Sequence, residues 1–203
     1  MTTSVDFYFD PGCPFSWITS RWLEEVRTQR DIVVTWRSFS LWDKNGRDES
    51  SGHAEMVKVT HRSLRVVEAV RATEGDALIG KLYTELGKRF HHDKETSDDA
   101  IRSAIAAAGL SSDYAAAIDN TDLDEAITSS MKVALDAAGN DVGVPLLVRD
   151  GRGYFGPVLS PAPTGADAGR LWDAIDGMLS MGDAFWELKR SRSGAPILPD
   201  RPE

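Results

Sequence analysis

The sequence contains a single cysteine, Cys13, in the segment Asp10–Trp17 (DPGCPFSW), whose residue types suit thiol chemistry. A short apolar run, Val5–Phe9, precedes it, and a helical pattern follows it. A cysteine between a strand end and a helix start faces free backbone N–H groups and the positive end of the helix dipole. Such sites can lower a cysteine pKa from about 8.5 to roughly 3.5–7.5. We therefore interpret Cys13 as a nucleophile, although most lone cysteines are small buried hydrophobic residues.

Ser16 follows three residues later, on the same side of the first helical turn. In a dithiol enzyme this position holds the resolving cysteine. A hydroxyl cannot resolve a disulfide, but it can donate a hydrogen bond to the Cys13 thiolate or to the sulfur of a bound thiol. The alternative is a helix-start serine that bonds to the backbone. The sequence leaves both roles open.

The elements that position Cys13 form a strand–helix–strand unit. Val5–Phe9 is short and aromatic, and Ile32–Ser38 is rich in β-branched residues, so both are predicted strands. Pro14 occupies the first position of the helix between them, where its missing N–H costs nothing. The spacing suits a parallel crossover.

Between His53 and Ala138 the sequence predicts helices and no strand. Ser97 is the expected cap of one of them, Thr121 or Asp122 the cap of the last, and Gly139 its stop. The predicted buried faces contain Met56, Val59, Ser63, Val66, Val67 and Val70; Leu78, Ile79, Leu82, Tyr83, Leu86 and Phe90; Ile101, Ala104, Ile105 and Ala108; and Leu123, Ile127, Met131, Ala134, Leu135 and Ala138.

Strands return after the helices. Pro145–Arg149 and Tyr154-Phe155 flank the hairpin turn Asp150–Gly153, and a last helix carries Leu171, Trp172 and Ile175. The tail Ser191–Glu203 is expected on the surface. This order predicts an α/β protein with a thioredoxin-like fold (β-α-β … β-β-α) and a large all-helical insertion. We expect residues 1–42 and 140–203 to form the thioredoxin-like domain and residues 43–139 the insertion.

In a thioredoxin-like fold we expect the proline of Val144-Pro145 to be cis and to face the cysteine across the active site. A cis X–Pro bond is otherwise uncommon, at about 5–6% of such bonds. The backbone N–H and C=O of Val144 would then be free to pair with an extended ligand. The alternative is an ordinary trans proline at a strand start.

Composition limits the classes of function. The formal net charge of −9 argues against nucleic acid or an anionic membrane as a partner. One cysteine cannot form an internal disulfide, the N-terminal residues lack the pattern of a signal peptide, and no apolar run approaches the length of a membrane span. We therefore expect a cytoplasmic protein. No Cys/His cluster has metal-ligand spacing and no glycine-rich phosphate loop follows a strand, so neither a metal nor a nucleotide is expected.

Residues Asp10–Leu23 (DPGCPFSWITSRWL) closely resemble the active-site segment of the mycothiol-dependent reductases of the DsbA family, which include enzymes described as mycothiol-dependent nitroreductases. The resemblance extends over almost the whole chain. Further matching segments are Tyr83–His91 (YTELGKRFH), Asp141–Pro145 (DVGVP), Phe155–Ser160 (FGPVLS), Gly169–Asp173 (GRLWD) and Phe185–Arg190 (FWELKR).

The resemblance implies a low-molecular-weight thiol as cofactor, mycothiol rather than glutathione, bound beside Cys13. It carries the nucleophile role to Cys13 and the cis-proline role to Pro145. Ser16 departs from the Cys-Pro-Trp-Cys motif of the nitroreductase-type members, which puts their dithiol cycle in doubt. The expected thiol-binding residues are Pro14, Phe15, Trp17, Val144, Pro145, Gly156, Pro157 and His91. The alternative for His91 is a helix end in solvent beside Asp93.

Three functions follow as hypotheses. In the first, Cys13 forms a mixed disulfide with a small disulfide or an adduct with an electrophilic substrate, and an external thiol releases it. In the second, Cys13 and Ser16 position a thiol in an S-transferase or isomerase, as in the similar kappa-class glutathione transferases and chromene-carboxylate isomerases, which have serine in place of Cys13. In the third, the chain is a non-catalytic binding module. A homodimer contact through the insertion is possible in each case.

Overall fold

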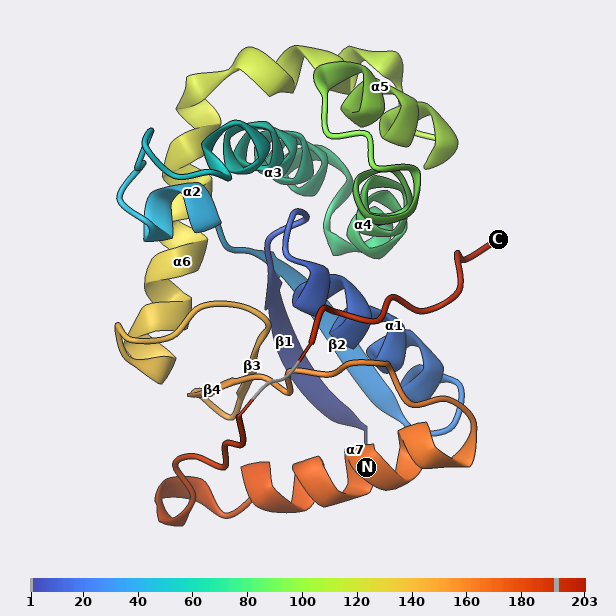
Figure 1. Cartoon of the computed structure of the whole chain (residues 1–203), viewed down its shortest axis with the longest axis vertical. Helices are drawn as coiled ribbons and strands as arrows, with labels where there is room; N and C mark the ends of the chain where they lie inside the picture. Colours follow the sequence, from blue (N-terminus) through green and yellow to red (C-terminus); the bar gives the residue numbers. More distant parts are fainter. Residues whose placement is uncertain (1, 192–193) are drawn as a thin grey trace.

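The computed structural model describes residues 2–191 and 194–203, and within them the strands form one mixed four-stranded sheet (Figure 1). The strand order is β2-β1-β3-β4. β1 runs parallel to β2, with Val5 opposite Val34, and antiparallel to β3, with Phe7 opposite Leu147. The central position of β1 places the loop after its last residue at the middle of the sheet edge. The strands are β1 (Thr3–Phe9), β2 (Ile32–Ser38), β3 (Leu146–Arg149) and β4 (Arg152–Phe155).

The helix that follows β1 is α1 (Pro14–Arg27), and it packs against the last long helix, α7 (Ala166–Leu179). Pro14 is at the first helical position, as the sequence predicts. The indole Nε1 of Trp22 donates to the carbonyl oxygen of Ala168 at 3.1 Å, which fixes α7 along α1.

Helices fill the chain between β2 and β3, as predicted, and they lie over one end of the sheet in Figure 1. The longest, α3, crosses above the ends of β1 and β2, while α6 descends along the sheet to reach β4. The α-helices are α2 (Leu41–Lys44), α3 (Ala54–Glu74), α4 (Ile79–Gly87), α5 (Asp98–Ala107) and α6 (Asp124–Ala138). Short turns occupy Asp76–Leu78, Lys88–Asp93, Ser112–Asp119, Thr121–Leu123 and, after α7, Gly182–Ala184.

The predicted cap of α5 and the predicted end of α6 are confirmed, whereas the predicted cap of α6 is not. Ser97 caps α5 by accepting a hydrogen bond from the Ala100 N–H, and Gly139 ends α6 with φ +88. The predicted cap of α6 by Thr121 or Asp122 is wrong. A 3-10 turn precedes α6, and the side chain of Asn120 caps that turn instead, at the N–H of Asp122.

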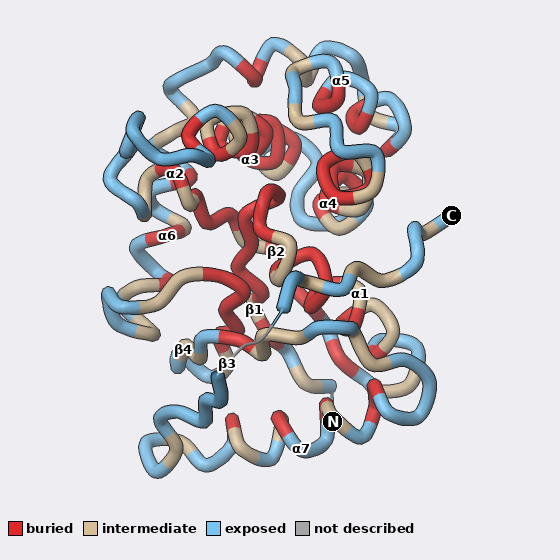
Figure 2. The backbone as a smooth tube through the Cα atoms, viewed as in Figure 1, coloured by how far each residue is buried: buried red, intermediate tan, exposed pale blue. Residues whose placement is uncertain are grey.

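One continuous hydrophobic core runs from the sheet into the helices above it (Figure 2). Phe7 and Trp36 of the sheet, Leu82 of α4 and Ile101 of α5 belong to it. Most residues of the predicted helical faces are buried. In α3, Met56 and Val59 are only half-buried, because the helix turns Val57 and Leu64 inward. The other half-buried members of these faces are Leu78, Leu123, Leu135 and Ala138. The sheet and the helices therefore stabilise each other, and the division of the chain at residues 43 and 139 stays a prediction.

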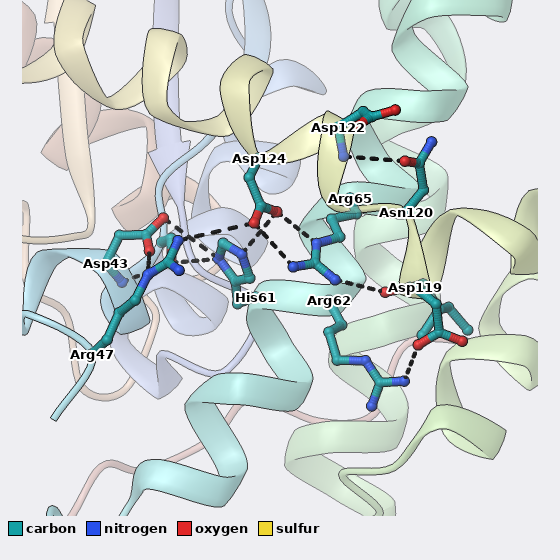
Figure 3. A network of polar contacts seen from close by, with 11 residues as sticks. Asp43, Arg47, His61, Arg62, Arg65, Asp119, Asn120, Asp122 and Asp124 are labelled. Atoms are coloured by element: carbon teal, nitrogen blue, oxygen red, sulfur yellow. Dashed lines mark hydrogen bonds and ion pairs between the residues drawn. The ribbon is translucent and has the colours of Figure 1, made fainter. Parts of the chain in front are cut away.

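A polar network joins α2, α3 and α6 on the side away from α1 (Figure 3). The buried His61 ring lies between Asp43 and Asp124, with Nε2 at 3.1 Å from Asp124 Oδ1. Arg65 makes two hydrogen bonds to the same Asp124 carboxylate, at 2.6 and 3.0 Å. This network fixes the start of α6 against α3.

Two observations concern the ends of the chain. In the predicted surface tail, residues 192–193 lie outside the described residues, and most of the remainder is exposed. None of the helices in the described ranges is both long enough and apolar enough to span a membrane.

Candidate active site

Cys13 is the N-cap residue of α1, with extended backbone dihedrals of φ −80 and ψ 113. Its Sγ accepts a hydrogen bond from the Ser16 N–H at 3.5 Å and lies 3.5 Å from the carbonyl oxygen of Val144, to which the thiol donates. The sulfur therefore touches both the helix start and the segment before β3. Cys13 is only 8% exposed, so little of it faces solvent.

The wall opposite Cys13 is the Val144–Pro145 segment, whose peptide bond is cis. The Pro145 carbonyl accepts a hydrogen bond from the Gly156 N–H at 2.8 Å. The Gly156–Pro157 peptide bond is also cis, and the Pro157 carbonyl accepts from the Thr19 hydroxyl of α1 at 2.7 Å. The residues singled out in this wall thus lie together, and they are bonded directly to α1.

Burial raises the pKa of the Cys13 thiol, and the nearby Asp10 carboxylate raises it further. The hydrogen bond from the Ser16 N–H and the nearby Ser16 hydroxyl lower the pKa, but burial outweighs both. The expectation of a lowered pKa is therefore wrong for this geometry. The helix start is present as predicted, yet the cost of burying a charged sulfur exceeds the stabilisation that the N–H groups supply.

Ser16 is completely buried, and its Oγ has no partner with hydrogen-bond geometry among the described residues. The alternative of a hydroxyl bonded to the backbone is therefore wrong. The hydroxyl lies close enough to Cys13 to lower the pKa of the thiol. An unsatisfied buried hydroxyl beside a thiol suits a second sulfur that arrives at Cys13.

His91 does not touch Cys13 through any contact of the described residues; it supports the loop before it. Its Nε2 lies 2.8 Å from the Pro11 carbonyl oxygen, and its ring stacks on Trp17. Burial lowers the pKa of His91 to about 4, so the ring is neutral at pH 7 and Nε2 carries the donated proton. The alternative of a histidine in solvent is wrong, since His91 is buried.

The segment Lys88–Asp93 forms a π-helical turn, which the sequence pattern did not reveal. The wider turn lets two adjacent histidines reach the same helix: His91 stacks on Trp17, and His92 accepts a hydrogen bond from the Trp17 indole at 3.2 Å. π-turns of this kind often occur at functional sites.

Trp17 is fully buried, so it supports the site from behind and presents no surface to a ligand. The Arg21 guanidinium lies over its ring, 4.3 Å from the centroid. A Cβ at Gly87 would come 2.2 Å from the same ring, which shows how closely α4 approaches. Pro14 and Phe15, by contrast, are half-buried at the start of α1, and their role in binding a thiol stays a prediction.

Asp10, in the same loop as Cys13, is a site residue to which the sequence pattern assigned no role. It is completely buried, and its two carboxylate oxygens accept from the N–H groups of Gly12 at 2.8 Å and Leu41 at 2.7 Å. The Asp-x-Gly spacing is the available signal, because an aspartate two residues before a turn N–H forms an Asx-turn. Asp10 thus joins the Cys13 loop to the first residue of α2.

A serine–histidine–aspartate series also exists, in the network of Figure 3. Ser40 Oγ lies 2.9 Å from His61 Nδ1, and His61 Nε2 lies 3.1 Å from Asp124. Ser40 is completely buried, and its Oγ accepts from the Asp43 N–H as the cap of α2. This series therefore links helices and offers no accessible nucleophile.

Comparison with known families places this geometry in context. A family model described as "Rv2466c-like: Mycothiol-dependent nitroreductase Rv2466c" matches residues 12–190. A protein described as "Uncharacterized protein Rv2286c", from Mycobacterium tuberculosis (strain ATCC 25618 / H37Rv), is 34% identical over 215 residues, which cover 96% of this chain and 85% of that protein.

Solved structures show the same fold. A probable DsbA oxidoreductase, SCO1869 from Streptomyces coelicolor, has a TM-score of 0.58 and 15% identity, over 86% of this chain and 90% of its own. The cytosolic disulfide reductase DsbM from Pseudomonas aeruginosa, determined with GSH, has a TM-score of 0.58 and 13% identity, over 86% and 99%. The predicted DsbA-like, thioredoxin-like fold is confirmed.

Proposed function

Because the chain belongs to the Rv2466c-like family of mycothiol-dependent nitroreductases, we propose that it is a monothiol oxidoreductase that uses mycothiol. Cys13 forms a mixed disulfide, and the low-molecular-weight thiol resolves it. The observation that carries this proposal is the pairing of Cys13, at the start of α1, with the buried and unpartnered hydroxyl of Ser16. The hydroxyl stands where a dithiol enzyme has its second cysteine, so an external thiol has to do that work.

The cycle balances without any further redox group. The Cys13 thiolate attacks one sulfur of a disulfide R–S–S–R′; the Cys13–S–R bond forms and R′S⁻ leaves with the electron pair of the broken bond. A mycothiol thiolate then attacks the sulfur of R, which returns Cys13 as thiolate and releases the mycothiol–R disulfide. Overall, one thiol is oxidised and one is released.

The residues around Cys13 supply position and hydrogen bonds. The Ser16 N–H lies 3.5 Å from Sγ and stabilises the thiolate in the attacking and leaving states. The Val144 carbonyl oxygen, also 3.5 Å from Sγ, accepts a hydrogen bond from the Cys13 thiol before the reaction. Since the pKa of Cys13 is raised, the thiol form dominates at neutral pH until an incoming group displaces one of these contacts.

Mass spectrometry after incubation with oxidised mycothiol tests the proposal. We expect one mycothiol to add to the wild-type chain at Cys13 and to leave on addition of free mycothiol, whereas Cys13→Ser gains nothing. The matched variant Ser16→Ala should still form the adduct, because the nucleophile is intact. A wild-type chain that forms no adduct, or one that free thiol cannot remove, would contradict the monothiol cycle.

The raised pKa of Cys13 favours a second candidate, a thiol S-transferase or isomerase. A protonated thiol and the Ser16 hydroxyl could both donate hydrogen bonds to the sulfur of a bound mycothiol and hold it for attack on an electrophile. Turnover of an electrophile with mycothiol that survives Cys13→Ser would support this function over the first. Loss of turnover in that variant would exclude it.

A further inference from the structure

The segment Gly194–Glu203 has no regular secondary structure, yet it is fastened at both ends to the surroundings of the active site. At one end the Ile197 N–H donates to the Ser160 hydroxyl at 2.8 Å. At the other, Arg201 pairs with Asp93 at 2.9 Å, and Lys88 donates to the backbone oxygen of Glu203 at 2.6 Å. We name Gly194–Glu203 the strap.

The two anchors lie on opposite sides of α1. Ser160 belongs to the loop after Pro157, whose carbonyl is bonded to Thr19 of α1. Asp93 and Lys88 belong to the π-turn that also carries His92, which is bonded to Trp17 of α1. The strap consequently spans from the loop after Pro157 to the π-turn, and in the view of Figure 1 it passes in front of α1.

Between the anchors, Leu198 is half-buried and packs against the main hydrophobic core, whereas its neighbour Ile197 is 57% exposed. The start of α1, between the two anchors, has little exposed surface: Ser16, Thr19 and Ser20 are completely buried, and Cys13 is 8% exposed. A disulfide therefore cannot approach the Cys13 sulfur in line until some of the residues that bury Cys13 move.

The strap is the part of that cover that is held most weakly. The helices of the insertion share one core with the sheet, so their displacement would expose many fully buried side chains. The Arg201–Asp93 pair is about half exposed, at 49% and 36% of its side chains, and exposed pairs contribute little. Besides this pair, two hydrogen bonds hold the strap, and Leu198 and three prolines, Pro196, Pro199 and Pro202, are half-buried in it.

We propose that the strap is a specificity-determining cover that admits small disulfides and electrophiles to Cys13 and excludes polypeptide chains. The inference rests on the proposed function, because it concerns what reaches the same thiol. An extended polypeptide would need to lie along the Val144 backbone for several residues. The strap is anchored at Ser160 on one side of α1 and at Asp93 and Lys88 on the other, so on this proposal only a ligand small enough to pass it reaches the sulfur.

Thiol labelling tests the cover without requiring any redox activity. The rate of Cys13 modification is measured with iodoacetamide and with a maleimide that carries a long polyethylene glycol chain, on the full chain and on a chain that stops before Gly194. We expect deletion to raise the rate with the bulky reagent roughly tenfold, since the closed population falls, and the rate with iodoacetamide by clearly less. Equal rates for the two chains with both reagents would overturn the proposal.

Because the truncated chain could fold poorly, two point variants of the full chain test the same cover. Leu198→Asp should reproduce the acceleration with the bulky reagent, because it removes the one strap side chain that packs on the core. Ile197→Asp is the matched control, since the neighbouring side chain is exposed and its backbone hydrogen bond remains. If the two variants are accelerated equally, or neither is, the strap does not act as a cover.

The outcomes separate this inference from the proposed function. If deletion of the strap accelerates labelling but the full chain forms no mixed disulfide with mycothiol, the role of the strap as a cover is supported and the monothiol cycle is contradicted. If the mixed disulfide forms but the labelling rates are the same with and without the strap, the monothiol cycle is supported and the strap is not a cover. Reduction of an unfolded, disulfide-containing polypeptide should be detectable only after deletion, and equal reduction by the full chain would also overturn the cover.

Discussion

The His91 Nε2 atom lies 2.8 Å from the carbonyl oxygen of Pro11, and this hydrogen bond joins the π-turn of the insertion to the loop that ends at Cys13. The two residues are 80 positions apart in the sequence. The bond requires a proton on Nε2, and burial lowers the pKa of His91 to about 4, so the ring is neutral at neutral pH and keeps its one proton on Nε2.

His91 makes stability fall as the pH falls. Its pKa is about 4 in the folded chain and near 6.5 when unfolded, so between these values the unfolded state binds more protons. This contribution to the free energy of unfolding is about 3 kcal/mol. It is fully present above about pH 6.5 and is lost by about pH 4. We expect His91→Phe to flatten this part of the pH profile in denaturant titrations, whereas the exposed His53→Phe leaves it unchanged. An unchanged slope in His91→Phe would refute the assignment.

Gly87→Ala should destabilise the chain, because its Cβ would come 2.2 Å from the Trp17 ring in the core. Overpacking of this kind costs about 1–3 kcal/mol. Gly177→Ala in α7 is the matched control: a Cβ there meets nothing within 4 Å, so the higher helix propensity of alanine should stabilise by up to about 1 kcal/mol. Denaturant midpoints measure both. Equal effects of the two variants would show that Trp17 has room to move.

Cys13 should react slowly with iodoacetamide at neutral pH, and its rate should keep rising beyond the pH at which an ordinary cysteine is half ionised, about 8.5. Asp10→Asn removes the negative charge that raises the pKa of the thiol, so the profile should shift to lower pH. The control is Asp6→Asn in β1, four residues before Asp10, where the carboxylate pairs with Arg37. A profile that stays in place in Asp10→Asn would show that burial alone sets the pKa.

Ser16→Cys should create a pair of thiols that can oxidise within the chain, because the Ser16 side chain lies beside the Cys13 sulfur. We expect disulfide reductase activity to rise and an internal disulfide to appear by mass spectrometry. Ser20→Cys is matched in residue type and helix, but its side chain points to the Trp17 carbonyl, at 2.7 Å, one turn away. Activity that stays flat in Ser16→Cys would mean that the two side chains do not meet.

Local signals explain how much of the fold could be predicted. The β-branched run of Ile32–Ser38, the proline at the first position of α1 and the Ser97 cap act within a few residues, and each appears where the sequence placed it. The cap of α6 was mispredicted because Asn120 and two polar residues after it compete for the same role, and only the 3-10 turn before the helix decides between them.

The site was only partly predictable, because its chemistry depends on long-range contacts. Sequence reasoning could place Cys13 at a helix start, but the burial that raises its pKa comes from segments distant in the chain. The same is true of Trp17, which was expected to line the pocket and instead lies beneath it, between Arg21 and His91. The roles of Ser16, Val144 and the remaining expected ligand residues stay predictions.

The separation of Cys13 from Val144 along the chain has a consequence for biosynthesis. The two residues are 131 positions apart, and β3 can pair with the central strand β1 only after the insertion has been made. Until then the only cysteine of the chain lacks its opposite wall, and a nascent chain on the ribosome exposes an unprotected thiol. Non-local pairing of this kind forms late. The cell's small thiols would thus meet Cys13 first during synthesis, before the fold controls its access.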